Sequence, residues 1–135
     1  MKNQIDYQTL EVKLGNYDTI NTTYNIPLPI NSILKGVDVS KKIINSTTNQ
    51  AIHCSVNLRQ TDVNSNIRLD HELLNGSLYN SGDSTATIYQ KRLSAILDIP
   101  IQKEGIELFF IFYNKSDQES FVNINWIVKN LEGGI

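Results

Sequence analysis

The sequence has little of what most catalytic and metal-binding sites are built from: one cysteine, two histidines and no glycine-rich loop. The single Cys54 cannot form an internal disulfide, and it cannot supply the several thiolates of a cysteine-based zinc site. The phosphate-binding glycine loop and the G-x-S-x-G elbow of serine hydrolases are also absent. We therefore expect no enzymatic activity, no cofactor, and no catalytic, cofactor-binding or metal-binding residues.

Long hydrophobic runs are missing as well. No apolar stretch approaches the roughly 18–20 residues that a membrane helix requires. The first residues, Met1 to Asp6, lack the apolar region of a secretory signal. We expect no membrane span and no signal peptide, with synthesis in a host cytoplasm and release by lysis or within an assembly.

Charge is sparse and evenly spread. Charged residues make up 19% of the chain, below the roughly 25% typical of soluble domains, and the net charge is −2. The closest basic pairs are Lys41-Lys42 and Lys91-Arg92. A nucleic-acid-binding protein normally gathers positive charge on one face, so this distribution argues against nucleic acid as a partner.

Alternation of apolar and polar residues is the strongest pattern that the chain does contain. Residues 7–14 and 51–59 place apolar side chains on one face and polar side chains on the other, as a strand with one dry face does. Residues 17–25 and 33–44 have a strand composition too, and Gly36 inside the second indicates a bulge or bend. This part of the chain predicts four strands.

The carboxy-terminal part predicts two more long strands. Residues 106–113 are apolar at nearly every position, which predicts a strand covered on both faces. Residues 121–131 alternate, and the intervening residues 114–120 are all polar. We interpret the pair as a hairpin, and we expect Trp126, Phe109, Phe110, Phe112 and Phe121 to lie in the core.

Two segments fit both a helix and a strand. Residues 66–74 have spacing for either, and Asn75-Gly76 beyond them is a turn signal. Residues 85–97 carry a helical stripe, yet the longer span 85–101 fits a period of two. Pro100 and the β-branched residues favour the strand.

About eight strands at regular spacing, with no internal repeat, predict an all-β fold. We expect residues 1–135 to form a single antiparallel β-sandwich, with an eight-stranded jelly roll as the best single topology.

Two short groups contain residue types found in metal or catalytic sites, but we expect them to have structural or solvent-exposed roles. Asp70-His71-Glu72 contains metal-ligand types, and His53-Cys54 has the residue types of a cysteine nucleophile and its base. Adjacent residues on a strand point to opposite faces, so neither group converges by strand geometry alone. We expect Cys54 to be a core residue and Asp70 to Glu72 to be solvated.

The chain resembles the small jelly-roll structural proteins of bacteriophage and other viral particles. The similarity lies in Leu97-Asp98-Ile99-Pro100-Ile101, the apolar run from Glu107 to Tyr113 and the alternating Val122 to Trp126, as in the closing strands of such domains. It implies a capsid, decoration, fibre or spike subunit of a virion, with copies of itself and other virion proteins as partners. Residues 1–7 carry no basic arm, which favours an outer or inter-capsomer position.

A carbohydrate-binding or receptor-binding β-sandwich is the alternative, with a glycan as possible ligand. It requires a row of exposed aromatic residues or a concave polar site on one sheet. An assembly subunit requires mixed apolar and polar contact surfaces instead. We expect such contacts at the loops 45–50, 60–83 and 114–120 and at the chain ends.

Overall fold

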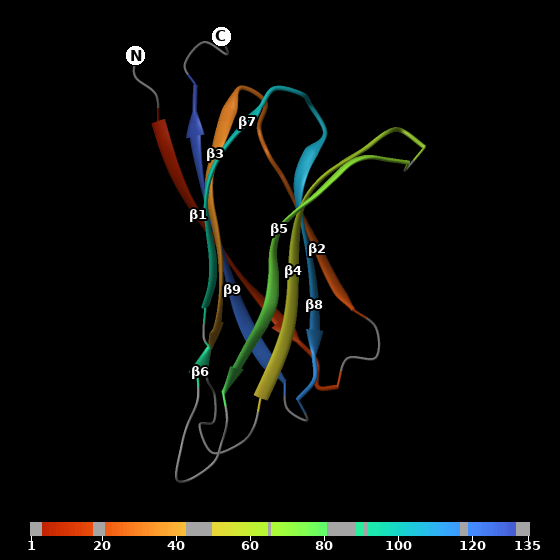
Figure 1. Ribbon diagram of the computed structural model, residues 1–135, viewed down its shortest axis with the longest axis vertical. Helices are drawn as coiled ribbons and strands as arrows, with labels where there is room; N and C mark the ends of the chain where they lie inside the picture. Colours follow the sequence, from red (N-terminus) through yellow and green to blue (C-terminus); the bar gives the residue numbers. More distant parts are fainter. Residues whose placement is uncertain are drawn as a thin grey trace.

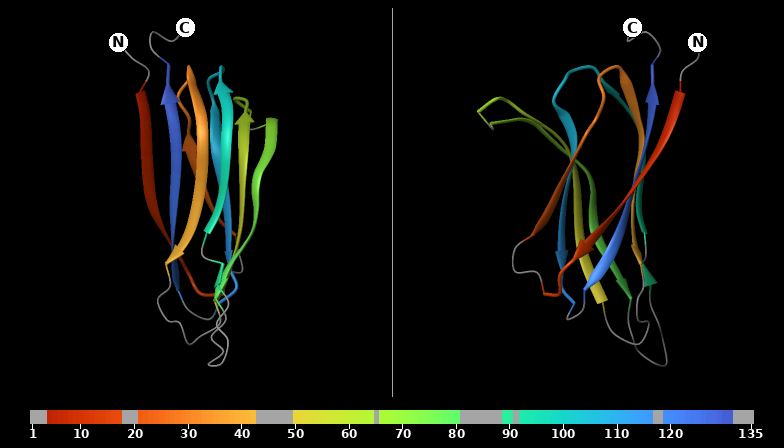
Figure 2. Two further views of the ribbon diagram at one scale, coloured as in Figure 1. Left: turned by 60° about the vertical axis from the view of Figure 1, so that its left-hand side comes forward. Right: turned by 180° about the vertical axis from the view of Figure 1, so that it is seen from behind.

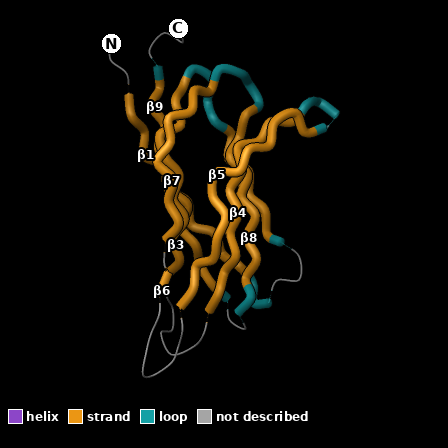
Figure 3. The backbone as a smooth tube through the Cα atoms, in the orientation of Figure 1, coloured by secondary structure: helices purple, strands orange, loops and turns teal. Residues whose placement is uncertain are grey.

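The computed structural model describes residues 4–17, 21–42, 50–64, 66–80, 89–90, 92–116 and 119–131, and these residues contain strands and connections only (Figure 1; Figure 3). The strands are β1 (Gln4–Leu14), β2 (Thr22–Pro27), β3 (Ser32–Lys42), β4 (Gln50–Thr61), β5 (Ile67–Asn80), the two-residue β6 (Tyr89–Gln90), β7 (Arg92–Ile101), β8 (Ile106–Asn114) and β9 (Ser120–Asn130).

The strands form two antiparallel sheets that pack face to face (Figure 2). Sheet A has the order β1-β9-β3-β7, and sheet B has the order β2-β8-β4-β5-β6. Successive strands of the chain mostly alternate between the sheets, which is the topology of a jelly roll. The expectation of an all-β jelly-roll sandwich is confirmed. In both ambiguous segments the described residues are almost all strand, and residues 85–88 and 91 lie outside the described part of the chain.

The expected hairpin of residues 106–131 is wrong. β8 pairs with β2 and β4 in sheet B, whereas β9 pairs with β1 and β3 in sheet A. The polar connection therefore crosses from one sheet to the other. Each strand buries one face against the opposite sheet, and pairing within a local hairpin would not place their apolar faces toward each other.

β8 supplies the centre of the core. Its inner side chains are fully or almost fully buried, and the Phe110 and Phe112 rings stack with centroids 6.0 Å apart. Trp126 is only partly buried at the margin of the core. Phe109 is on the outer face of β8, half-buried beneath the Arg59 guanidinium, 3.8 Å from the ring centroid. Phe121 is partly buried and, like Phe109, lies outside the core cluster, so the expectation of a core position is wrong for both.

The turn expected at Asn75-Gly76 is absent, because both residues lie inside β5. A Cβ atom on Gly76 would come within 3.1 Å of a methyl group of Leu93 on β7. The glycine therefore marks a close approach between the two sheets, where a side chain would not fit without displacement.

The two faces of β8 allow a matched test of the core. We expect Phe110→Ala to cost about 3–5 kcal/mol of unfolding free energy, the usual range for deleting a buried phenylalanine. Phe109→Ala removes the same atoms from a half-exposed site and should cost less than half as much. Denaturant melts of the two variants measure both values, and equal losses would contradict the assignment of the faces.

Candidate functional site

The only cysteine, Cys54, is buried in the core. Cys54 has no exposed surface, and burial raises the pKa of its thiol to about 12. His53 points to the opposite face, where its Nδ1 lies 3.0 Å from the Ser77 hydroxyl. The expectation for Cys54 is confirmed, and the two side chains do not act together.

A thiol-labelling experiment checks this placement. Because the thiolate forms only near pH 12 in the folded protein, Cys54 should react slowly with an aromatic disulfide reagent at pH 8. The same chain in denaturant should react fast, since the pKa then returns to its usual value. Fast labelling of the folded chain would show that the thiol is accessible.

The Asp70-His71-Glu72 group is exposed and does not converge. Asp70 accepts hydrogen bonds from the Asn57 amide at 2.7 Å and from Arg59 at 3.2 Å. Within the described residues no three His, Cys, Asp or Glu side chains gather closely enough to hold a metal ion. That this protein needs no metal stays a prediction.

Part of the connection between β8 and β9 is buried and bonded to neighbouring segments of the chain. Asn114, Ser116 and Ser120 are buried, and Asn114 donates a hydrogen bond to the Gly15 carbonyl at 2.8 Å. The Ser116 hydroxyl accepts the Ala51 amide at 2.8 Å. The bonds of Asn114 and Ser116 tie β8 to its neighbours. Because all three side chains are buried, they are not part of the contact surface expected at 114–120.

Lys41 is buried at the same end of the sandwich. It follows Val39 on the inner face of β3, and burial lowers the pKa of its ammonium group to about 8. Residues 43–49, which include most of the expected loop 45–50, lie outside the described part of the chain.

A β-ribbon projects from sheet B away from sheet A (Figure 1; Figure 2). This β4–β5 arm comprises residues 59–64 and 66–72, so the loop expected at 60–83 is largely strand. It carries apolar side chains in solvent: Val63 at the tip is 99% exposed, and Ile67 is more than half exposed. The arm is thus an extended element that exposes one apolar side chain, Val63, at an otherwise polar tip.

Local hydrogen bonds hold the arm in shape. The Asp62 carboxylate accepts the backbone amides of Asn64 and Asn66, both at 2.9 Å, and pairs with Arg68 at 3.1 Å. These contacts, the Asn66 amide first, lower the pKa of Asp62. At the root, the Gln60 side chain donates to the Glu104 carbonyl at 3.0 Å.

The Asp62 turn gives a pH-dependent prediction. Because the folded pKa is lowered, the turn is stabilised above the ordinary aspartate pKa and loses this support as the pH falls through the folded value. Relative to the intrinsic rate at each pH, hydrogen exchange of the Asn64 and Asn66 amides should accelerate over that acidic range. Asp62→Ala should accelerate it at neutral pH, and Asp62→Asn, which keeps an acceptor oxygen, should do so less. Unchanged exchange in Asp62→Ala would contradict the assignment.

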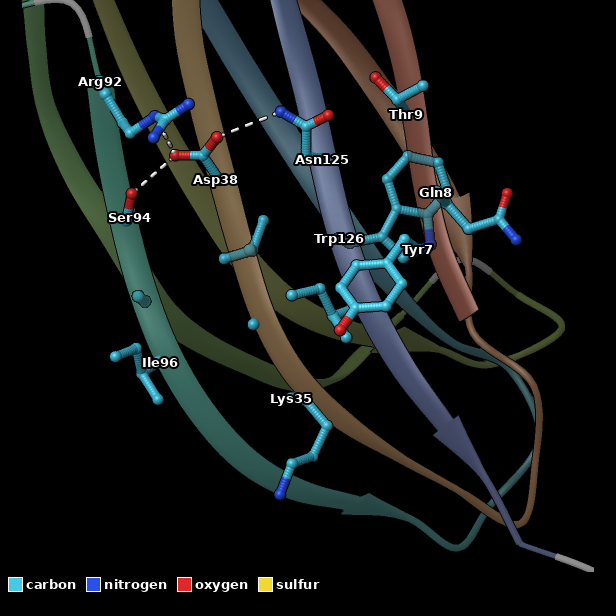
Figure 4. Close-up of a pocket in the computed structure, with 14 residues that line it drawn as sticks. Tyr7, Gln8, Thr9, Lys35, Asp38, Arg92, Ser94, Ile96, Asn125 and Trp126 are labelled. Atoms are coloured by element: carbon cyan, nitrogen blue, oxygen red, sulfur yellow. Dashed lines mark hydrogen bonds and ion pairs between the residues drawn. The ribbon is translucent and has the colours of Figure 1, made fainter. Parts of the chain in front are cut away.

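A groove of about 670 Å³ lies on the outer face of sheet A (Figure 4). Tyr7 of β1 and Ile96 of β7 stand on its two sides and are 76% and 98% exposed. Ile127 of β9 and Gly36 of β3 occupy the row between them. We call this site the outer groove, and its middle is apolar.

Gly36 keeps the floor of the outer groove low. The register of β3 shifts between Leu34 and Gly36 against both neighbouring strands, as expected for a bulge. A Cβ atom on Gly36 would lie 3.3 Å from the Ala95 backbone carbonyl, which cannot rotate away. The bulge and the missing side chain together leave the depression between Tyr7 and Ile96.

The ends of the outer groove are polar and internally paired. At one end Asp38 accepts hydrogen bonds from Ser94 at 2.6 Å and Asn125 at 3.1 Å, and it pairs with Arg92 at 3.1 Å. Lys35 lies at the other end (Figure 4), and it pairs at 2.9 Å with Asp98, a residue next to the groove lining. Each cation faces a carboxylate, so the groove has no excess of either charge.

The sequence alone did not reveal the outer groove. Its side chains come from four strands that are far apart along the chain and meet only through the order of sheet A. Ile96 does indicate an apolar group on the outer face, because it is out of phase with the alternation of Leu93, Ala95 and Leu97.

A scan against protein-family models and a search of curated proteins find no match to the chain. Solved structures do match. A chain of the cyanophage Pam1 capsid asymmetric unit is similar with a TM-score of 0.58 and 10% identity over 96% of this chain and 86% of that one.

Capsid proteins of infectious bursal disease virus are similar as well. A chain of its T=1 particles has a TM-score of 0.54 at 10% identity, covering 98% of this chain but 33% of that one. The VP2 subviral particle gives 0.53 at 10% identity, with 98% and 34% covered. This chain therefore has a fold that viral capsid proteins share, which confirms the structural side of the resemblance.

Among the described residues there is no helix long and apolar enough to cross a membrane.

Proposed function

We propose that residues 1–135 form one structural subunit of a virus particle, which works by joining copies of itself or neighbouring shell proteins. The observation that carries the proposal is the match to the cyanophage Pam1 capsid chain, which spans nearly the whole of both chains. The subunit would be made in the host cytoplasm and reside in the virion.

The surface of the molecule supports an assembly role. Val63 and Ile67 on the β4–β5 arm, and Tyr7 and Ile96 at the sides of the outer groove, are exposed in a single copy. Exposed apolar groups of this kind typically mark contact sites between proteins. The chemically reactive residues do not support catalysis. Cys54 is buried, and the Asp70 carboxylate is bonded to Asn57 and Arg59. We therefore propose a non-enzymatic function.

Glycan binding is the second candidate, and the outer groove favours it. A sugar ring could stack on the exposed Tyr7, and Arg92 and Asn125 could bond its hydroxyl groups. The groove offers one exposed tyrosine rather than a row of aromatic residues. A glycan array with the wild-type protein and a Tyr7→Ala variant tests this function. Glycan binding is supported if a defined sugar binds the wild type and does not bind the variant.

The mass of the native protein tests the structural role. We expect light scattering and mass photometry of the purified chain to show species larger than one 15.3 kDa chain, rising with concentration. Electron cryo-microscopy of the native source should place the chain in a particle. A monomer at every concentration, found outside any particle, would overturn the proposal.

A further inference from the structure

The β4–β5 arm and the outer groove have complementary shapes. The tip of the arm is convex and presents one apolar side chain, the almost fully exposed Val63, among polar residues, with the exposed Ile67 close behind it. The outer groove is a depression whose middle is lined by Tyr7, Ile96 and the bare backbone of Gly36. One surface is a protrusion and the other a recess, and both leave apolar groups in water.

The two surfaces of one molecule cannot meet. The arm leaves sheet B in the direction away from sheet A, whereas the outer groove opens on the far face of sheet A (Figure 1; Figure 2). The arm is also fixed at its root by the bond from Gln60 to Glu104. The tip can therefore reach an outer groove only on another copy.

Charges at the two surfaces match. Arg68 near the arm tip is largely exposed, although it pairs with Asp62. Asp98 at the groove rim is also largely exposed, beside Lys35. Because both side chains remain largely exposed within these local pairs, a guanidinium group and a carboxylate are accessible for an ion pair between two copies. Arg59 and Asp70 on the arm form an ion pair with each other, as do Arg92 and Asp38 in the outer groove, so neither pair adds like charge that opposes contact.

We propose that the tip of the β4–β5 arm docks into the outer groove of a second copy of this chain. This inference rests on the proposed function and deepens it, because it names the partner and both halves of the contact. Val63 enters the depression over Gly36, between Tyr7 and Ile96, and Arg68 meets Asp98.

The contact is head-to-tail, since two different surfaces meet. Each copy then keeps one unused arm and one unused groove, so the copies form a ring if the rotation closes and an open chain if it does not. A single arm tip covers less than the roughly 800 Å² per partner of a typical stable interface. Each contact is accordingly weak, and closure of a ring stabilises the whole by linking several contacts.

Two substitutions test the two halves separately. Val63→Asp disables the arm and Ile96→Asp disables the groove, and both side chains are so exposed that the fold should be unaffected. Each should weaken self-association by roughly 100-fold or more, because a carboxylate would be buried without a partner. Ile30→Asp is the matched control, since Ile30 is 41% exposed and lies on neither surface. It should assemble as the wild type does.

Mixing the variants is the decisive experiment. The Val63→Asp chain keeps an intact groove, and the Ile96→Asp chain keeps an intact arm. Each alone should be a monomer, whereas a mixture at high concentration should give a dimer of one chain of each kind and nothing larger. Native mass spectrometry with one variant isotopically labelled identifies that dimer.

The other outcomes separate this inference from the proposed function. If the wild type assembles and both variants assemble equally well, the arm–groove contact is refuted while the structural role stands. If both variants are monomers but do not combine, the two surfaces bind something other than each other. A wild type that never assembles refutes both proposals. Binding of a defined glycan that is lost in Tyr7→Ala shows that the outer groove is a sugar site instead of a docking site for the arm.

Discussion

Burial of one face of the strands against the opposite sheet is the constraint on which the structure depends. β8 shows it most clearly, because Phe110 and Phe112 have no exposed surface while Ile111 between them is only partly buried. The same alternation removes Cys54 from solvent and raises its pKa. It also decides what remains outside, since the residues out of phase with the core, such as Tyr7 and Ile96, become the surface available to a partner.

The elements of the fold could be predicted from the sequence because alternation is a local property. The alternation at residues 7–14 and 51–59, and the bulge at Gly36, needed no knowledge of the partner strands. The pairing could not be predicted in the same way. Apart from β4–β5 and the short β5–β6 contact, the pairings of the described strands join segments that other strands separate in sequence. The supposed hairpin of β8 and β9 failed for this reason.

Gly76 illustrates a second limit. Next to Asn75 it has the composition of a turn, yet its role is set by Leu93, a residue on the facing sheet. The outer groove is a stronger case, because β1, β3, β7 and β9 each contribute a few residues to it. The projecting arm could not be foreseen either. Ile67 and Leu69 alternate with polar residues as in a core strand, and only the ends of the neighbouring strands determine that the arm extends beyond the sandwich.

The pairing of β1 with β9 has a consequence for how the chain folds. It joins Gln4 to Asn130, so this ladder forms only after almost the entire polypeptide has been brought into one closed loop. The entropy lost in closing such a loop must be overcome before any of its hydrogen bonds is gained, which makes folding slow for a domain of this size. Until then β9 lacks its outer neighbour, and an unpaired strand edge is open to association with other chains. A longer time in that state therefore gives newly made chains more opportunity to aggregate before the sandwich is complete.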